Sequence, residues 1–385
     1  MTNPQTNHKN RIYKYDNAKA ILIFLVVVGH LTTIYASDSH LVRWITLWIY
    51  TFHMPAFIFI TGLLHKRYAT VASAGRTYMR WDRFWGYLLC GYGLKVFLYF
   101  FRRAVGQNPP WYWIAEPQAP WYLFVMAEYE LLFWLLRRID CKVKPAYIIA
   151  ASFAISAFIG YFPSVGDTFC LARMINFLPL YALGYYADPA KVTAKLEEHR
   201  SKIIAWILLA VSVVVCCAGP WQIYRMRKWF TGRRSYEFIE SFFPGTYEFD
   251  WAIRLGAWLV AIVMTFTVLT LIPDRKIRVL TETGRRTLQI YFWHRPICYW
   301  LCGIRLLPML VTAFGGSYNE SVLGEIYGHA FGGGALPMGA GLAVYLLIGL
   351  LITLVLSIKI FKHPTEDLMD LGRRIASITG ERKTS

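Results

Sequence analysis

The sequence predicts an all-α, polytopic integral membrane protein of about ten transmembrane helices, with both chain ends in the cytoplasm. Apolar residues make up 56% of the 385 residues, and the mean hydropathy is +0.37, well above the level of soluble globular proteins. These residues fall in runs of roughly 17–25, the length of a helix that crosses a bilayer. The basic residues are distributed unevenly between the loops that join the runs.

Ten apolar runs are candidate membrane-spanning helices. The fourth, fifth and sixth are interrupted or flanked by Glu128, Glu130, Asp167 and Arg173. In chain order the runs are 18–36, 44–64, 82–101, 121–136, 145–161, 168–186, 202–219, 252–273, 287–311 and 337–361.

The orientation follows from the basic residues. With a cytoplasmic N-terminus, 26 of the 41 Lys and Arg residues lie in cytoplasmic segments and 8 in segments on the opposite side, which is the positive-inside pattern. This pattern accounts for most of the net charge of +18, so we expect no nucleic-acid partner. It predicts a cytoplasmic tail over 1–17, a membrane domain over 18–361, and a cytoplasmic tail with a short helix over 362–385.

The first run carries three ionisable residues, Asp16, Lys19 and His30, at its start and within it. All three fall within about 60° of one helix face, and Lys19 and His30 are about 16 Å apart along the axis. Charged groups in hydrocarbon are costly and usually face a bundle interior or a wet cavity, which makes this stripe a candidate functional site. The alternative places Asp16 and Lys19 at the lipid interface, with His30 hydrogen-bonded inside the bundle.

The second and third runs add two candidates. His53 precedes Pro55, which removes a backbone donor and kinks the helix near mid-membrane; His53 either binds substrate or is a buried packing group. Arg80 and Arg83 lie three residues apart at the predicted cytoplasmic edge, and paired guanidinium groups suit the phosphates of a nucleotide-like ligand. The alternative for the pair is membrane anchoring together with Asp82.

Seven basic residues fall within the runs, more than a structural bundle usually carries, and they predict an anionic or polar substrate. Among them, Lys95, Arg254 and Arg305 lie near helix ends, where we expect their charged groups to reach toward the headgroups. The long loop 220–251 mixes Trp and Tyr with basic and acidic residues. That composition suits sugar rings and their hydroxyls, with a membrane-interface belt as the alternative.

The ninth run carries Tyr291 and His294 on one face, ahead of Pro296. His294 also lines up with Cys298 and Cys302 at intervals of four residues, but no third strong ligand or acidic helper is evident at a fixed spacing, so we expect no metal site. A histidine with a pKa near neutrality is the natural general base for a hydroxyl group.

Four stretches of the sequence resemble the acyltransferase 3 family of integral membrane O-acyltransferases, and in particular its fucose 4-O-acetylase-like branch. The resemblance covers about residues 11–361, and the ten helices agree with the family's architecture. Lys19 departs from the commoner Arg, and a Lys cannot form a bidentate fork. The four stretches are Tyr15–Lys19 with Gly29 and His30, Phe52–Gly62, Arg80–Arg83 and Tyr291–His294.

The resemblance implies an acyltransferase, acetyl-CoA-dependent, that takes the acyl group from cytoplasmic acyl-CoA. The expected acceptor is a hydroxyl of a cell-surface glycan or a lipid-linked saccharide. The expected roles are divided among eight residues: catalysis by His30, Asp16 and Lys19, binding of the coenzyme A phosphates by Arg80 and Arg83, and binding of the acceptor by His53, Tyr291 and His294.

We expect a multi-pass protein of a cell membrane, the bacterial inner or plasma membrane. Because no appended extracellular esterase-like domain is expected, the chain completes the transfer itself or hands it to a partner protein. A transporter or flippase for an anionic or sugar-linked lipid is the main alternative, since broken helices and intramembrane charges suit it as well. A structural partner of a cell-wall complex is a third possibility.

Overall fold

The computed structural model is almost entirely helical. It describes residues 11–35, 40–72, 79–104, 106, 108–139, 143–218, 221–303, 317–319, 333–335 and 338–379. Within these residues the strands form one antiparallel pair, β1 (Ser317–Asn319) and β2 (Gly333–Ala335). The prediction of an all-α bundle is confirmed.

The helices fall into two groups by length. The longer ones are α1 (Tyr13–Tyr35), α2 (His40–Ala72), α3 (Trp81–Ala104), α4 (Trp121–Arg138), α5 (Pro145–Phe158), α6 (Leu171–Tyr186), α8 (His199–Ala218), α11 (Asp250–Leu271), α13 (Thr287–Gly303), α16 (Met338–Leu356) and α17 (Thr365–Thr379). The shorter ones are α7 (Pro189–Glu197), α9 (Arg227–Phe230), α10 (Tyr236–Glu240) and α12 (Arg278–Arg285), together with 3₁₀ turns at Ile159–Tyr161, Trp221–Met226, Tyr247–Phe249 and Lys359–Lys362.

Among the described residues, five helices are long and apolar enough to cross a membrane: α1, α2, α3, α8 and α11. A sixth crossing is possible if α16 and α17, which meet at an angle of 77°, form one broken span. Each of the ten predicted runs overlaps a helix. A multi-pass membrane protein is therefore confirmed, whereas ten crossings and their orientation stay predictions.

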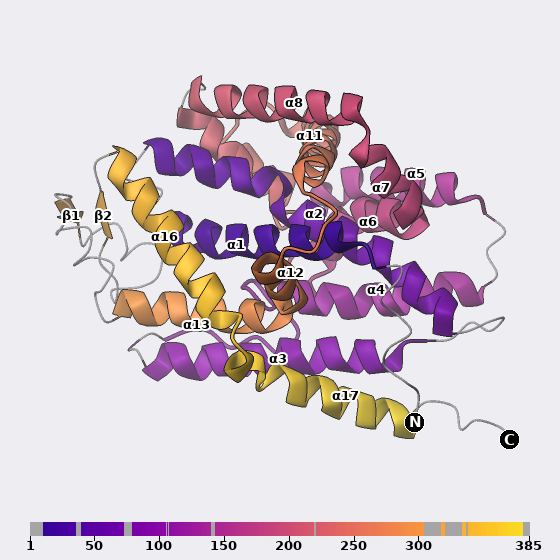
Figure 1. Ribbon diagram of the computed structural model, residues 1–385. Helices are drawn as coiled ribbons and strands as arrows, with labels where there is room; N and C mark the ends of the chain where they lie inside the picture. Colours follow the sequence, from indigo (N-terminus) through magenta and orange to yellow (C-terminus); the bar gives the residue numbers. More distant parts are fainter. Residues whose placement is uncertain are drawn as a thin grey trace, which may run out of the picture.

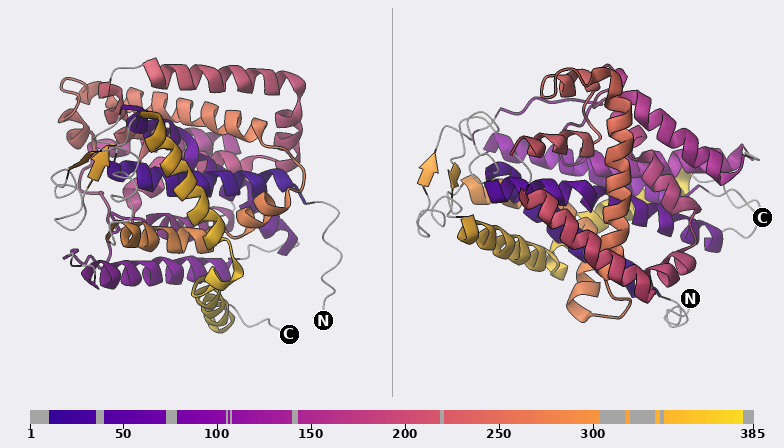
Figure 2. Two further views of the ribbon diagram at one scale, coloured as in Figure 1. Left: turned by 60° about the vertical axis from the view of Figure 1, so that its left-hand side comes forward. Right: turned by 90° about the horizontal axis from the view of Figure 1, so that it is seen from above.

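The bundle has a consistent order of layers in different views. From one side to the other lie α8 and α11, then α1, then α13, and finally α3 with α17 (Figure 1; left view of Figure 2). The β1–β2 hairpin lies at one end of the bundle, and α1 begins and α17 ends at the other. The start of α1 and the end of α17 thus share one end, as a topology with both termini on one side requires.

The start of α1 is held by polar contacts to the end of α11, to the loop that follows α11 and to α7. Lys14 is fully buried, and its Nζ donates to the carbonyl of Leu269 at 3.0 Å and pairs with Glu197 at 2.7 Å. Asn17 donates to the carbonyls of Pro273 and Arg275 at 3.0 and 2.9 Å. These bonds satisfy backbone carbonyls that a buried loop would otherwise leave unpaired.

Helix α12 approaches α1 so closely that the contact requires a glycine. A Cβ on Gly284 would collide with the backbone carbonyl of Asp16. Because Gly284 permits this approach, the next residue, Arg285, comes within 3.9 Å of the Asp16 carboxylate.

Helices α2 and α6 also meet through glycines. A Cβ on Gly62 would collide with the backbone of Tyr181, and one on Gly184 would collide with the backbone of Phe59. Small residues that let backbones approach closely are typical of helix pairs within membranes. This contact places α6 inside the bundle, where its Arg173 and Asn176 are buried.

The expectation that Lys95 and Arg254 reach toward the headgroups is wrong. Lys95 is buried and donates to the carbonyl of Ala115 at 2.8 Å, with Glu116 at 3.6 Å. Arg254 is fully buried and donates to the carbonyl of Trp229 at 2.8 Å. Both side chains find partners in loops that fold back into the bundle, which periodicity along one helix does not reveal. Arg305 lies outside the described residues.

Candidate functional site

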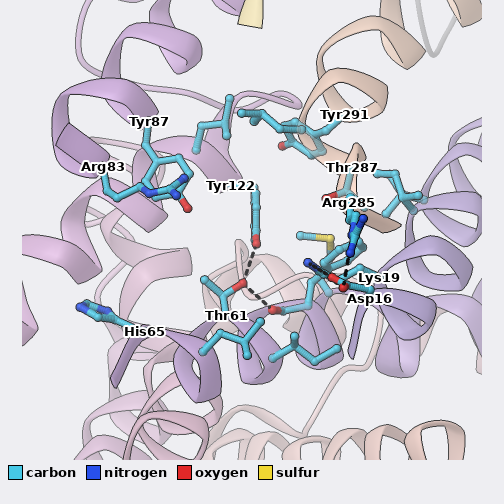
Figure 3. Close-up of a pocket in the computed structure, with 18 of the residues that line it drawn as sticks. Asp16, Lys19, Thr61, His65, Arg83, Tyr87, Tyr122, Arg285, Thr287 and Tyr291 are labelled. Carbon is cyan, nitrogen blue, oxygen red and sulfur yellow. Dashed lines mark hydrogen bonds and ion pairs between the residues drawn. The ribbon is translucent and has the colours of Figure 1, made fainter. Parts of the chain in front are cut away.

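Two neighbouring cavities are lined by most of the predicted site residues. The larger has a volume of about 400 Å³ and lies between α1, α2, α3, α4, α12 and α13 (Figure 3). We call it the first cavity. Apolar side chains such as Val26 and Phe57 share its walls with many polar ones. The polar and aromatic lining consists of Arg11, Asp16, Lys19, Thr61, His65, Arg80, Arg83, Tyr87, Tyr122, Arg285, Thr287 and Tyr291.

One wall of the first cavity is organised around Asp16. Its carboxylate is buried and pairs with Arg11 at 2.6 Å, with Lys19 at 3.0 Å and with Arg285 at 3.9 Å. A single carboxylate therefore holds three cations in place without neutralising all of them. Figure 3 shows Lys19 and Arg285 beside Asp16, facing the open space of the cavity.

The opposite wall carries Arg83 and Tyr87 (Figure 3). The Arg83 side chain is 47% exposed and pairs with the Asp82 carboxylate at 3.9 Å. Arg80 differs sharply, because its Nη2 donates to the buried Glu130 at 2.5 Å and its side chain is only 12% exposed. The two arginines that look equivalent in the sequence are thus one buried ion-pair partner and one cavity-facing cation.

The Glu130 carboxylate also lies 3.3 Å from Nε2 of His65. The other nitrogen of that ring, Nδ1, is hydrogen-bonded to the Tyr181 hydroxyl. Arg80, Glu130, His65 and Tyr181 form a buried polar network behind the first cavity. Nε of Arg80 and Nε2 of His65 are buried without a hydrogen-bond partner among the described residues, so the network is only partly satisfied.

The second cavity has a volume of about 240 Å³ and lies toward the hairpin end of α1. Three of the predicted site residues line it: His30, His53 and Tyr291. It is roofed by the segment that follows α8, which contributes Arg227, Lys228, Phe230 and Thr231 and then Arg233 and Arg234. The remaining lining residues are Val26, Tyr50, Met54, Pro117, Gln118, Ala119, Trp121, Arg173, Phe177 and Arg295.

Three histidines gather beside the second cavity. The rings of His30 and His294 stack with centroids 5.1 Å apart. Nδ1 of His294 lies 2.7 Å from the carbonyl of Tyr291, and Nδ1 of His53 lies 2.7 Å from that of Ile49. A carbonyl can only accept, so in both rings Nδ1 carries the proton and Nε2 is left as an acceptor. His294 is fully buried behind His30 and is not among the lining residues of either cavity.

The loop that the sequence marked as sugar-facing folds over the second cavity. Two of its aromatic residues, Trp229 and Tyr236, are buried in the core and so do not belong to an interface belt. The pKa of Lys228 in this loop is lowered from 10.5 to about 8. The main cause is burial, and the nearby positive charges of Arg227, Arg234 and Arg233 add to it.

The two cavities adjoin one another. Val26, Met54 and Tyr291 line both, so these three side chains form the wall between them. Val26 lies one helical turn before His30 on α1. The structure therefore has two cavities that meet beside His30.

The predicted site residues divide between these cavities. Asp16, Lys19, Arg80 and Arg83 line the first. His30 and His53 line the second, and Tyr291 lines both. Asp16 and Lys19 share a helix face with His30 but lie in a different cavity, because about 16 Å of helix separates Lys19 from His30.

Several site residues escaped the sequence analysis. Arg285 lies at the edge of a basic loop and was counted there only as a topological charge, and His65 lies at the edge of another basic loop and was given no role. His65 follows Thr61 by four residues and so shares its helix face, a signal that could have placed it beside the cavity. Arg227 and Arg234 belong to the loop whose composition was noted but whose position required the fold.

Among the described residues, no group of three or more His, Cys, Asp or Glu side chains is placed to hold a metal ion. Cys298 is buried on α13, and the side chain of Cys302 lies outside the described residues.

One comparison with known proteins bears on this arrangement. Residues 12–362 match the family model described as an acyltransferase domain, Acyl_transf_3. No curated protein sequence and no solved structure matches the chain.

Proposed function

Since this chain belongs to the acyltransferase 3 family of membrane acyltransferases, we propose that it moves an acyl group from acyl-CoA, and specifically acetyl from acetyl-CoA, to a hydroxyl group of a glycan or lipid-linked saccharide. The observation that supports this proposal best is the meeting of two polar cavities beside His30. A two-substrate transfer needs one site for the donor and one for the acceptor, with the reacting atoms brought together between them.

The first cavity fits an acyl-CoA donor. Its charged lining carries Arg11, Lys19, Arg83 and Arg285, with Asp16 as the carboxylate that faces them. Guanidinium groups bind phosphates well because they offer paired donors in a planar fork. The phosphates would lie near these cations, and the thioester would extend toward Tyr291 and Met54. Cytoplasmic entry follows from the predicted topology.

The second cavity fits the acceptor, and His30 would act there as general base. As the acceptor oxygen attacks the thioester carbonyl, its proton passes to an imidazole nitrogen, a carbon–oxygen bond forms and the carbon–sulfur bond breaks. The coenzyme A thiolate then leaves and takes the proton from the imidazolium. His294, stacked on His30 at 5.1 Å, would hold the ring in place, and His53 would contact the acceptor.

The wall between the cavities must let the thioester pass. Of its three side chains, Met54 is the most adaptable, because an unbranched thioether has three rotatable bonds and no preferred shape. We infer that Met54 moves aside when the donor is bound. The transporter alternative draws no support from the family match, and the bacterial cell membrane remains the proposed location.

The experiment that tests the proposal uses purified full-length protein in detergent. Coenzyme A should raise its melting temperature, and acetyl-CoA should be hydrolysed slowly or transferred to an added saccharide. His30→Ala should slow acetyl release at least 100-fold, which is the scale on which a general base contributes. Coenzyme A should still stabilise this variant.

The matched control is His199→Ala, because His199 is exposed at the start of α8 and lines neither cavity. This variant should keep wild-type activity. Normal turnover by the His30 variant would remove His30 from the mechanism, and the absence of any effect of coenzyme A on wild-type protein would overturn the donor assignment.

A further inference from the structure

We propose that the acceptor is itself an anion, a saccharide that carries a carboxylate or phosphate group beside the hydroxyl to be acylated, and that the second cavity binds this group. The proposal rests on the proposed function, since it names the substrate class of the acceptor site. Two observations support it: the positive charge of the side chains that line the second cavity, and the neutral groups that contact most of these side chains.

Six basic side chains line the second cavity, and none of its described lining residues is Asp or Glu. They come from four separate parts of the fold, α6, α9, the segment after α9 and α13, and they converge on a space of about 240 Å³. Like charges repel, so such convergence is costly unless an anion occupies the space between them. The six are Arg173, Arg227, Lys228, Arg233, Arg234 and Arg295.

Aromatic rings, which attract a cation without neutralising it, hold three of these side chains. The Arg227 guanidinium lies 4.9 Å from the ring centre of Tyr50, and that of Arg234 lies 4.0 Å from Phe238. Lys228 lies 5.4 Å from Phe238. Within the described part of the chain, the carboxylate pairs of this cluster involve Arg173 and Arg233, and none involves these three side chains.

Asp167 compensates only part of the charge. It forms a bidentate pair with Arg233, with distances of 2.6–2.8 Å, and lies 3.9 Å from Arg173. Arg173 otherwise donates to the carbonyls of Glu116 and Pro117 at 3.0 and 3.1 Å, which are neutral. The cluster therefore keeps a surplus of positive charge directed at the cavity.

Two further observations agree with a bound oxyanion. Nε of Arg227 is buried and has no hydrogen-bond partner among the described residues, so it is a donor awaiting an acceptor. The lowered pKa of Lys228 reports burial together with uncompensated positive charge around it.

The dimensions and position of the cavity fit a sugar acid or sugar phosphate. A volume of 240 Å³ equals roughly eight liquid water molecules, which suits one sugar ring and its anionic substituent. His30 and His53 line the same space as the cations. A ligand whose oxyanion is bound by Arg227 and Arg234 would therefore present its hydroxyls to the histidines.

The test compares matched saccharides on purified full-length protein in neutral detergent. The probes are an oligomer of galacturonic acid, a neutral oligomer of galactose of equal length, and inorganic phosphate. We expect the acidic oligomer to bind at least tenfold more tightly than the neutral one, and its affinity to fall about tenfold in Arg227→Gln and in Arg234→Gln, as for a lost hydrogen bond to a charged group. The affinities for glucose 1-phosphate and for glucose are compared in the same way, to test a phosphate in place of a carboxylate.

Arg103→Gln is the matched control, because Arg103 also lies over a tyrosine ring, at 5.9 Å from Tyr99, but lines neither cavity. It should leave the affinity unchanged. Equal affinity for acidic and neutral oligomers would overturn the proposal, as would an equal loss in Arg103→Gln, which would mark unspecific charge attraction. Binding of inorganic phosphate as tight as that of the sugars would also overturn it.

A last arm separates a lipid headgroup from a sugar. In vesicles of neutral lipid the preference for the acidic oligomer should persist. If only anionic lipid binds at Arg227, and the oligomers do not compete with that lipid, the proposal fails. Coenzyme A binding is measured in parallel on the same variants. If coenzyme A binds but no acidic preference appears, only this inference falls, whereas failure to bind coenzyme A would remove the proposed function itself.

Discussion

Arg80 and Arg83 are predicted to have separable roles, although the sequence presents them as one motif. Arg80 is paired at 2.5 Å with Glu130, whose side chain is only 3% exposed and which also faces His65. Arg83 is 47% exposed and borders the first cavity. Replacing Arg80 should therefore damage stability, whereas replacing Arg83 should damage donor binding.

The magnitudes differ enough to be measured. Removing one partner of a buried ion pair leaves the other charge uncompensated and costs about 3–5 kcal/mol, so Arg80→Ala should lower the free energy of unfolding by that amount. The exposed pair of Arg83 and Asp82 is worth about 0–1 kcal/mol. Losing a charged hydrogen bond to a coenzyme A phosphate costs about 1.5–3 kcal/mol, so Arg83→Gln should weaken coenzyme A binding roughly 10- to 100-fold.

The assays are SDS titration of the protein in mixed micelles, for stability, and calorimetric titration with coenzyme A, for affinity. Adding Glu130→Gln to Arg80→Ala should restore most of the lost stability, because no buried charge is then left unpaired. Equal losses of stability in the two arginine variants would refute the reasoning. So would an Arg80→Ala protein that is fully stable but no longer binds coenzyme A.

Three further predictions concern other parts of the site. Met54→Trp should slow acetyl transfer at least tenfold and leave the affinity for coenzyme A within about twofold of wild type, because a bulky, rigid side chain blocks the passage through the shared wall. Binding and turnover are measured on one preparation, and unchanged turnover would contradict the prediction. Affinity of the second cavity for an acidic saccharide should fall as the pH rises from about 7 to 9, because the Lys228 ammonium, with a pKa of about 8, then loses its proton, and Lys228→Arg should flatten the profile. Gly284→Ala should lower the free energy of unfolding by about 1–3 kcal/mol or more, because the added methyl group overpacks against the Asp16 carbonyl. It should also weaken coenzyme A binding, since Arg285 is displaced. Wild-type stability of this variant in SDS titration would contradict the prediction.

The sequence by itself determined the class of the protein, and it singled out residues that line cavities in the structure. Hydropathy and run length predict helices that cross a membrane, because a span must satisfy its backbone hydrogen bonds internally and be apolar over about 20 residues. The cost of charge in hydrocarbon then marks Asp16, Lys19 and His30 as residues that face something other than lipid. All three line a cavity in the structure.

Only the tertiary structure decided which of these residues act together. Helical periodicity states that Lys19 and His30 share a face, but not that Lys19 meets Arg285 in one cavity while His30 meets Arg227 in another. Those partners are about 200 or more residues away, and their positions depend on close approaches such as that of Gly284 to α1. Periodicity is a property of one helix, whereas a cavity is bounded by several, and the packing between them is set by side chains that no local pattern connects.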